Sequence, residues 1–552
     1  MTTDALTVAV IRAKLLAVAE EVVEVMARTA FSPLLNQSRD FSTAVLDAHG
    51  RLLAQAERVP IHMGALPFAV EAVRYRFGDD ASPGDVFLLN DPYDGGSHLP
   101  DFTFCQPVFA EGALRFWVVN RAHQGDIGGI SPGGYSPQAT EIWHEGLRIP
   151  PLRFVTQGRM TEGILDLICL NSRMPQDTRG DVLACLASLR AGAARLDALV
   201  ARYGSAVATS SCEAILEAGE RAMRQEIAAW PDGVYHGESA LDPPAPGATP
   251  ITVRAQVTLS GSDVEVDLTG SDDQVASFLN SSRPNTMAAV NVAFMYLSAT
   301  QDARNQGSSR PLTIRTRLGS LVDPIAPAPV TACTTLTAST IIEAVMRAMA
   351  TAAPDRVLCG FARRFRIAIK GEGRDGRPFL WHHFSNRGGA GANAGEDGWT
   401  NLGVVHSPGG NPSPSVEQTE ANYPFTVESY LLRANSGGAG QFRGGLGGSY
   451  VLRYDGASAA LVTPTGDGVA IPPYGLAGGL PGLPNSVAIE HAGCAEPLDA
   501  KSGTRVLHRG DRFIHHAAGG GGYGDPARRD PDRAARDRQR GYCDPSSEGA
   551  TA

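Results

Sequence analysis

The sequence predicts an α+β protein made of several structural units. Three observations lead to this prediction. Apolar residues recur at helical spacing in residues 5–29 and again from about 173 to 231. Alternating apolar and polar residues follow from about 234 to 275, and beyond about residue 361 the chain is β-like and glycine-rich. A length of 552 residues allows about two to four units with cores of their own.

The composition is that of an ordinary globular protein. Apolar residues make up 43% and charged residues 19%, and 48 basic against 58 acidic residues give a net charge of −10. The basic run near the C-terminus is interleaved with aspartate, so we expect no nucleic-acid partner. No stretch of about 18 apolar residues and no signal-peptide pattern occur, so we expect no membrane span. The eight cysteines are scattered without a CxxC pair, which favours the cytoplasm.

The N-terminal region, residues 1–172, is expected to be an α/β region that carries the site. Residues 5–29 should form an amphipathic helix, and "DFSTAVLDAHGRLLAQA" should form a hairpin around the turn "DAHG". Two buried strands, in "GDVFLLNDPYDGG" and "LRFWVVNRAHQGDIGG", each end in a loop rich in His, Asp and Gly. Polar loops at strand ends are where sites are commonly built on a rigid scaffold.

The rest of the chain divides into a helical segment, a β-rich half and a tail. Residues 173–232 should be mostly helical up to the "PDG" stop. Residues 233–529 should form a β-rich, glycine-rich half that includes helices near 285–300 and 337–353. Residues 530–552 are polar and are expected to form a loosely held tail.

Histidines and carboxylates are concentrated in four loops of the N-terminal region, which hold four of the chain's 13 histidines. Imidazole and carboxylate ligands together suit Mn, Fe or Zn, because they are neither an all-oxygen nor a thiolate set. The side chains are Glu57, His62, Asp91, Asp94, His98, Asp101, His123, Asp126, Glu141, His144 and Glu145.

The stretch "NRAHQGDIGGISPGG" contains an H-x-x-D pattern at His123 and Asp126. Two such ligands can reach one ion if the chain turns tightly between them, and Gly125 makes that turn easy. The residues alone leave other interpretations open. His123 could be a loop histidine bonded to backbone, and Asp91 and Asp94 also suit turn positions.

Two common enzyme motifs are absent from the sequence. It has no P-loop and no G-x-S-x-G, so we expect neither a nucleotide site of that kind nor a serine nucleophile on this chain. The strings "GGAGQFRGGLGG" and "AGGGGYG" do not lie between a strand and a helix. Close backbone packing and turns are therefore favoured over ligand binding for these glycines.

Seven motifs occur in an order that resembles the hydantoinase B/oxoprolinase family. They include "GDVFLLNDPYDGGSHLPDFTFCQPVF", "NRAHQGDIGGISPGGYSPQATEIWHEGLRIPP" and "YLLRANSGGAGQFRGGLGG", and together they extend from residue 5 to about 529. The family comprises the B-type subunit of N-methylhydantoinases, the C-terminal half of 5-oxoprolinases and the large subunit of acetone and acetophenone carboxylases. The resemblance therefore implies one catalytic subunit over residues 1–529.

The resemblance implies that such a subunit works with an A-type partner. The partner binds ATP and phosphorylates the carbonyl oxygen of the substrate, which accounts for the missing nucleotide motif. The pair then opens a lactam or imide ring, or adds carboxylate to an enol phosphate. The resemblance also implies a divalent metal held by His and acidic residues, with His123 and Asp126 at matching positions. His144 stands where many members have a less basic residue, often glutamine.

We therefore expect a cytoplasmic B-type subunit of an ATP-dependent cyclic-amide hydrolase that contains a divalent metal, Mn, Fe or Zn. The metal ligands are expected among His62, Asp91, His98, His123, Asp126 and His144. The general base is expected among Glu57, Asp101 and Glu141. Backbone N–H groups at Ile127, Gly128 and Gly129 could lie near a phosphate or oxyanion. The alternatives are a ketone carboxylase subunit and a non-catalytic scaffold that completes the partner's site.

Overall fold

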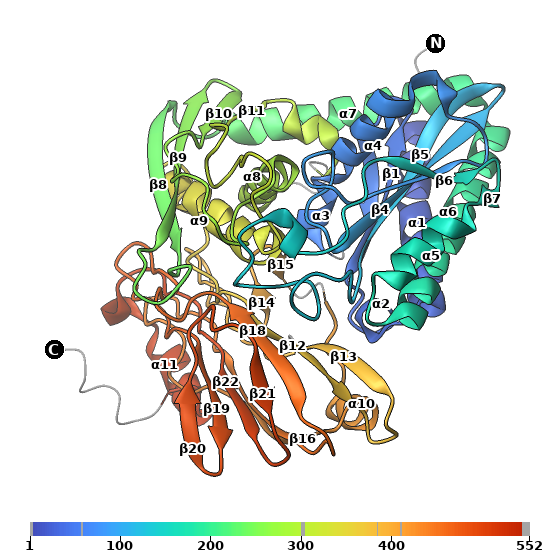
Figure 1. Cartoon of the computed structure of the whole chain (residues 1–552). Coiled ribbons are helices and arrows are strands. Elements are labelled where there is room, and N and C mark those ends of the chain that lie inside the picture. Colours follow the sequence, from blue (N-terminus) through green and yellow to red (C-terminus); the bar gives the residue numbers. More distant parts are fainter. Residues whose placement is uncertain (1–3, 57–58, 300–303, 384, 409–410, 544–552) are drawn as a thin grey trace.

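A computed structural model describes residues 4–56, 59–299, 304–383, 385–408 and 411–543 (Figure 1). The described chain has the predicted α+β class, with helices packed on several mostly antiparallel sheets. In the part of the chain that the structure describes, every helix is too short or too polar to cross a bilayer. Glu57 lies outside the described residues.

The N-terminal sheet has seven strands in the order β2-β1-β5-β4-β3-β6-β7, and every neighbouring pair is antiparallel. The expected hairpin is present as its first two strands. The strands are β1 (Phe41–Asp47), β2 (Leu52–Ala56), β3 (Val86–Leu89), β4 (Asp101–Ala110), β5 (Ala113–His123), β6 (Leu152–Thr156) and β7 (Arg159–Met160).

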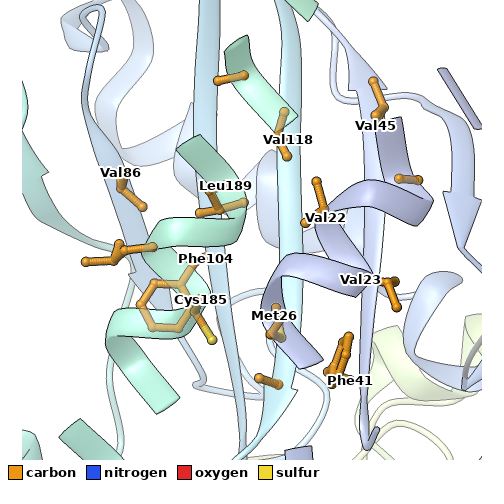
Figure 2. Close-up of a cluster of buried hydrophobic side chains, with 14 of the residues drawn as sticks. Val22, Val23, Met26, Phe41, Val45, Val86, Phe104, Val118, Cys185 and Leu189 are labelled. Carbon is orange, nitrogen blue, oxygen red and sulfur yellow. The ribbon is translucent and has the colours of Figure 1, made fainter. Parts of the chain in front are cut away.

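Helices cover both faces of this sheet. Because side chains alternate along a strand, Val118 of β5 joins the core under α1 and α6, whereas Val119 joins a second core under α4. The helices of the region are α1 (Ala5–Thr29), α2 (Pro33–Asn36), α3 (Pro60–Met63), α4 (Leu66–Phe77), α5 (Glu162–Leu170), α6 (Pro175–Tyr203) and α7 (Ser205–Ile227). Figure 2 shows part of the first core, formed by Val22, Val23, Met26, Phe41, Val45, Val86, Phe104, Val118, Cys185 and Leu189.

The middle of the chain forms a four-stranded sheet in the order β11-β10-β9-β8, which packs against two helices. The helices near 285–300 and 337–353 that the sequence predicted are present as α8 and α9. The elements are β8 (Gly233–Leu241), β9 (Ile251–Ser260), β10 (Asp263–Asp267), α8 (Arg283–Leu297), β11 (Leu312–Arg315) and α9 (Ala338–Met349).

Two further sheets, of four and five strands, enclose a third core in the C-terminal part (Figure 1). The four-stranded sheet contains β12 (Phe365–Glu372), β13 (Pro378–His383), β18 (Ala460–Gly466) and β21 (Arg505–Leu507). The five-stranded sheet contains β16 (Phe425–Leu432), β17 (Gly448–Tyr454), β19 (Ser486–His491), β20 (Cys494–Pro497) and β22 (Arg512–His516). The short elements β14 (Gly403–Val404), β15 (Ser407–Pro408) and α10 (Val416–Asn422) lie between β13 and β16 in the chain.

The glycine strings pack backbone against backbone, as the sequence favoured. A Cβ atom on Gly520 would lie 1.8 Å from the carbonyl oxygen of Ala390, and one on Gly389 would lie 1.9 Å from that of Gly445. No side chain fits at either distance, so these positions need glycine for space.

The segment expected to form a loose tail contains a helix, α11 (Pro531–Gln539), that is attached to the rest of the chain by ion pairs. Its Asp537 is buried and forms ion pairs with Arg443 at 3.2 Å and Arg529 at 2.6 Å. These ion pairs, which composition alone does not reveal, attach the helix to the glycine-rich part of the chain.

Candidate metal centre

Three of the expected residues converge at one edge of the N-terminal sheet. Asp101 begins β4 and His123 ends β5, and the antiparallel register makes these two residues direct partners. His98 lies in the loop that leads into β4. The nearest ligand atoms of His98, Asp101 and His123 all lie within 4.8 Å of one another, and all three side chains are buried. They form a group that can hold a metal ion.

The hydrogen bonds of His98 fit such a group. Its Nδ1 lies 2.6 Å from the carbonyl oxygen of Thr331 and donates to it. In a neutral imidazole, Nε2 then carries a lone pair, yet it lies 2.9 Å from Oδ1 of Asp101. A cation between these two acceptors would satisfy both of them. A ligand histidine whose second nitrogen donates to a backbone carbonyl is the usual arrangement in metal sites.

Asp101 lies at the centre of the group. Its Oδ1 is 3.1 Å from Nδ1 of His123, and its Oδ2 accepts a hydrogen bond from Ser97 at 2.8 Å and lies 3.5 Å from Nε2 of His62. Burial alone would raise the pKa of this carboxyl, but the positive charges that His62 and His98 carry when protonated lower it well below its usual range. Burial lowers the pKa of His123. An ionised carboxylate and a neutral imidazole are the forms that bind metals.

Asp126 lies apart from this group, although the sequence pairs it with His123. One of its oxygens lies 2.9 Å from Nη1 of Arg173, and the carboxylate also accepts hydrogen bonds from the backbone N–H groups of Gly128, Gly133 and Arg173. Four donors from the protein therefore occupy this carboxylate. Asp126 thus attaches its loop to Arg173, just before α6, and it is not one of the three clustered residues.

The other residues expected in the site form contacts of their own outside the group. Asp91 accepts a hydrogen bond from Arg148 at 2.7 Å and another from the N–H of Tyr93, as a turn residue does. His144 and Glu141 are partly exposed, and 3.5 Å separates Nε2 of the one from Oε1 of the other. The N–H of Gly128 is taken by Asp126, and the carbonyl groups of Gly128 and Gly129 accept hydrogen bonds from Arg173.

Glu145 was named among the loop carboxylates of the sequence, but no role in the site was expected of it. Its buried carboxylate accepts hydrogen bonds from the N–H groups of Val330 and Thr331, at 3.0 and 2.7 Å. Thr331 is the residue whose carbonyl fixes the ring of His98. Glu145 thus positions the segment that orients a candidate ligand. Burial raises the pKa of Glu145 to about 7.

Stability should therefore decrease as pH rises through the range in which Glu145 ionises. The unfolded chain releases this proton near its ordinary pKa of 4.5, whereas the folded chain holds it up to about 7. The folded state is favoured at low pH, and about 3 kcal/mol of unfolding free energy is lost between these two values. Glu145→Gln should remove this slope. Denaturant titrations of metal-free protein from pH 5 to 8 measure it.

Glu141→Gln is the matched control, because Glu141 lies in the same motif and its side chain is 44% exposed. This variant should keep the slope of the parent protein. Parallel stability curves for the parent and Glu145→Gln would contradict the assignment of the slope to Glu145.

Side chains from distant segments complete the surroundings. The ring of Tyr135 lies 5.9 Å from that of His98 and 5.8 Å from that of His123. The ring of His382, from β13, lies 6.0 Å from that of His123, and its Nε2 lies 2.7 Å from the carbonyl oxygen of Gly125. Nothing in the sequence around His382 predicts a place in the site, because this residue lies on an ordinary strand about 260 residues after His123.

The family model for hydantoinase B/oxoprolinase matches residues 4–526 of the chain. The β subunit of caprolactamase from Pseudomonas jessenii is 33% identical over 541 residues, covering 96% of this chain and 92% of that protein. The B-type subunit of a putative D-/L-hydantoinase from Pseudomonas sp. (strain NS671) is 30% identical, with 98% of this chain and 93% of that protein covered.

Two solved structures have the same fold. The crystal structure of ATP-dependent caprolactamase from Pseudomonas jessenii superposes with a TM-score of 0.93 at 31% identity and covers 99% of this chain and 95% of that one. The nucleotide-free structure of acetone carboxylase gives a TM-score of 0.90 at 20% identity and covers 99% of this chain and 79% of that one. The second likeness concerns the fold alone.

Proposed function

Because the chain belongs to the hydantoinase B/oxoprolinase family, we propose that it is the B-type subunit of an ATP-dependent cyclic-amide hydrolase. An A-type partner would bind ATP and phosphorylate the carbonyl oxygen of a lactam or imide, and this subunit would then open the ring. The observation that carries the proposal is the buried group of His98, Asp101 and His123.

The chemistry of ring opening explains what such a group is needed for. Amide resonance makes lactam hydrolysis slow, and phosphorylation of the carbonyl oxygen removes that resonance and creates a leaving group. We propose that His98, Asp101 and His123 hold a divalent ion, with Mn, Fe and Zn as the metals that suit these ligands. Such an ion would supply Lewis-acid polarisation of the phosphorylated substrate and a more acidic water.

The chain's own residues would keep this group in the correct protonation state. Ser97 donates a hydrogen bond to the Asp101 carboxylate, and the carbonyl of Thr331 holds the ring of His98. Among the expected general bases, Asp101 is committed to the ligand group by these contacts. His382 donates through Nε2 to Gly125, and its Nδ1 has no partner among the described residues. Burial and the charge of Arg366 hold the pKa of His382 well below its usual range, so we propose that the neutral ring accepts a hydrogen bond at Nδ1 beside His123.

The partner and compartment belong to the same proposal. Both Pseudomonas relatives are named as one component of a larger enzyme, which supports an A-type partner for this chain. The absence of a nucleotide motif supports an ATP site on that partner. All eight cysteines are unpaired, which supports a reducing cytoplasm.

The test is to purify the chain together with an A-type partner and measure ATP turnover and ring opening. Caprolactam, 5-oxoproline, hydantoins and simple ketones are the substrates to compare. We expect ATP-dependent ring opening of a cyclic amide that is lost on chelation and restored by a divalent metal. ATP turnover with none of these compounds would overturn the proposal.

The fold shared with acetone carboxylase makes a ketone carboxylase subunit the second candidate. Incorporation of carbon from labelled bicarbonate into a ketone-derived product, without ring opening of any cyclic amide, would favour it. A third candidate, a non-catalytic scaffold, requires that ring opening by the complex be indifferent to chelation and to substitution of His123.

A further inference from the structure

Arg366 of β12 lies against the wall of the candidate metal centre. Its guanidinium carbon is 3.1 Å from the ring centroid of Tyr135, so the two groups stack. The same Tyr135 ring contacts His98 and His123 at 5.9 and 5.8 Å. One aromatic ring thus separates a buried guanidinium from the candidate ligands.

The guanidinium of Arg366 lacks acceptors for part of its hydrogen-bonding capacity. The residue is 5% exposed, and no described residue offers an acceptor to its Nε or Nη2. The hydroxyl of Tyr135 is also buried without a partner among the described residues. Burial lowers the pKa of Arg366 to about 10, so the side chain remains charged at neutral pH. A buried charge with unsatisfied donors is costly unless an anion binds to it.

The charges around Arg366 are mostly positive. Arg364 lowers the pKa of Arg366 through its charge, and Arg364 and Arg387 line a common cavity with Asn386 and Asn411. Asp40 is the carboxylate whose charge acts on both Arg364 and Arg366. Three guanidinium groups and the two carboxylates of Asp40 and Asp101 leave a net positive charge, and this favours an anionic ligand.

We propose that Arg366 and the Tyr135 hydroxyl form a subsite for the phosphoryl group of the activated amide, an inference that rests on the proposed function. The planar fork of arginine matches the oxygens of a phosphoryl group, and Tyr135 supplies a further donor. Since the Tyr135 ring also contacts His98 and His123, the subsite adjoins the candidate ligands. Arg364 and Arg387 would attract the anion towards Arg366.

The test measures binding of inorganic phosphate to the full-length chain by calorimetry, without partner or ATP and after chelation of metals. The parent should bind phosphate, and Arg366→Gln should bind it at least about tenfold more weakly, because a charge-assisted pair is lost. Tyr135→Phe keeps the stacked ring and removes only the hydroxyl, so it should weaken binding by a smaller factor. Arg377→Gln, which removes a charge from the exposed hairpin that joins β12 and β13, should bind like the parent.

Several results of these binding measurements would overturn the proposed subsite. Absence of phosphate binding to the folded parent, or equal binding by Arg366→Gln and the parent, would overturn the subsite. Stronger binding of acetate than of phosphate would overturn its assignment to a phosphoryl group. If Arg366→Gln does not fold, an unchanged affinity in Tyr135→Phe would overturn it as well. These results do not depend on ring opening, so the subsite and the proposed function can fail separately.

Discussion

Replacement of Asp101 by asparagine should leave the chain folded and deprive it of its metal. Asparagine has nearly the shape of aspartate, but it lacks the charge that faces His98 and His123. Elemental analysis should find close to one divalent ion per chain in the parent and less than about 0.1 in the variant. Ring opening by the complex with the A-type partner should decrease by about a thousandfold or more, because metal polarisation contributes several kcal/mol.

Two control variants make this result specific. Asp94→Asn changes a partly buried carboxylate of the same loop that does not belong to the group, so metal content should match the parent. Asp126→Asn weakens the contact with Arg173 and should reduce stability while the metal content is retained. Full metal content in Asp101→Asn together with loss of metal in Asp126→Asn would contradict the geometry of the buried group. That outcome would restore Asp126 as the ligand expected from its spacing.

The comparison of these aspartates shows what the sequence could predict about the site. The N-terminal region contains the H-x-x-D pattern twice, at His98 and Asp101 and again at His123 and Asp126. Both patterns follow buried strands, so local sequence gives no reason to prefer one of them. The structure groups the first pattern with His123, because the register of β4 and β5 pairs Asp101 with His123. Strand register depends on the whole sheet and cannot be obtained from a short motif.

Other parts of the site depend on contacts between distant segments. Arg173, which pairs with Asp126, is 47 residues further along the chain. Arg366, which stacks on Tyr135, and His382, whose ring lies beside that of His123, both belong to the C-terminal part of the chain. Composition and periodicity predict which segments become strands or helices, but they do not indicate which strand faces a given loop. The strands of the N-terminal sheet were therefore predictable in part, whereas the order β2-β1-β5-β4-β3-β6-β7 was not.

Loss of Arg363 should destabilise the fold strongly. This residue is buried, and it joins Glu343 of α9 at 2.6 Å to Asp467, which directly follows β18, at 2.9 Å. Lys501 also contacts Asp467, at 2.9 Å. Removal of one partner from a buried ion pair leaves a charge in a medium that solvates it poorly. The network connects the middle of the chain with the C-terminal sheets, so we expect both parts to be affected together.

Arg363→Met should therefore lower the free energy of unfolding by about 3–5 kcal/mol, which urea titrations followed by circular dichroism can measure. Arg453→Met is the matched control, because Arg453 forms partly exposed pairs with Glu428 and Asp455, which solvent screens, so this variant should be far less destabilised. Glu343→Met combined with Arg363→Met should recover part of the loss, since neither of these two charges then remains buried without the other. Equal destabilisation by Arg363→Met and Arg453→Met would mean that solvent reaches the Arg363 network, and the assignment of a buried ion pair would fail.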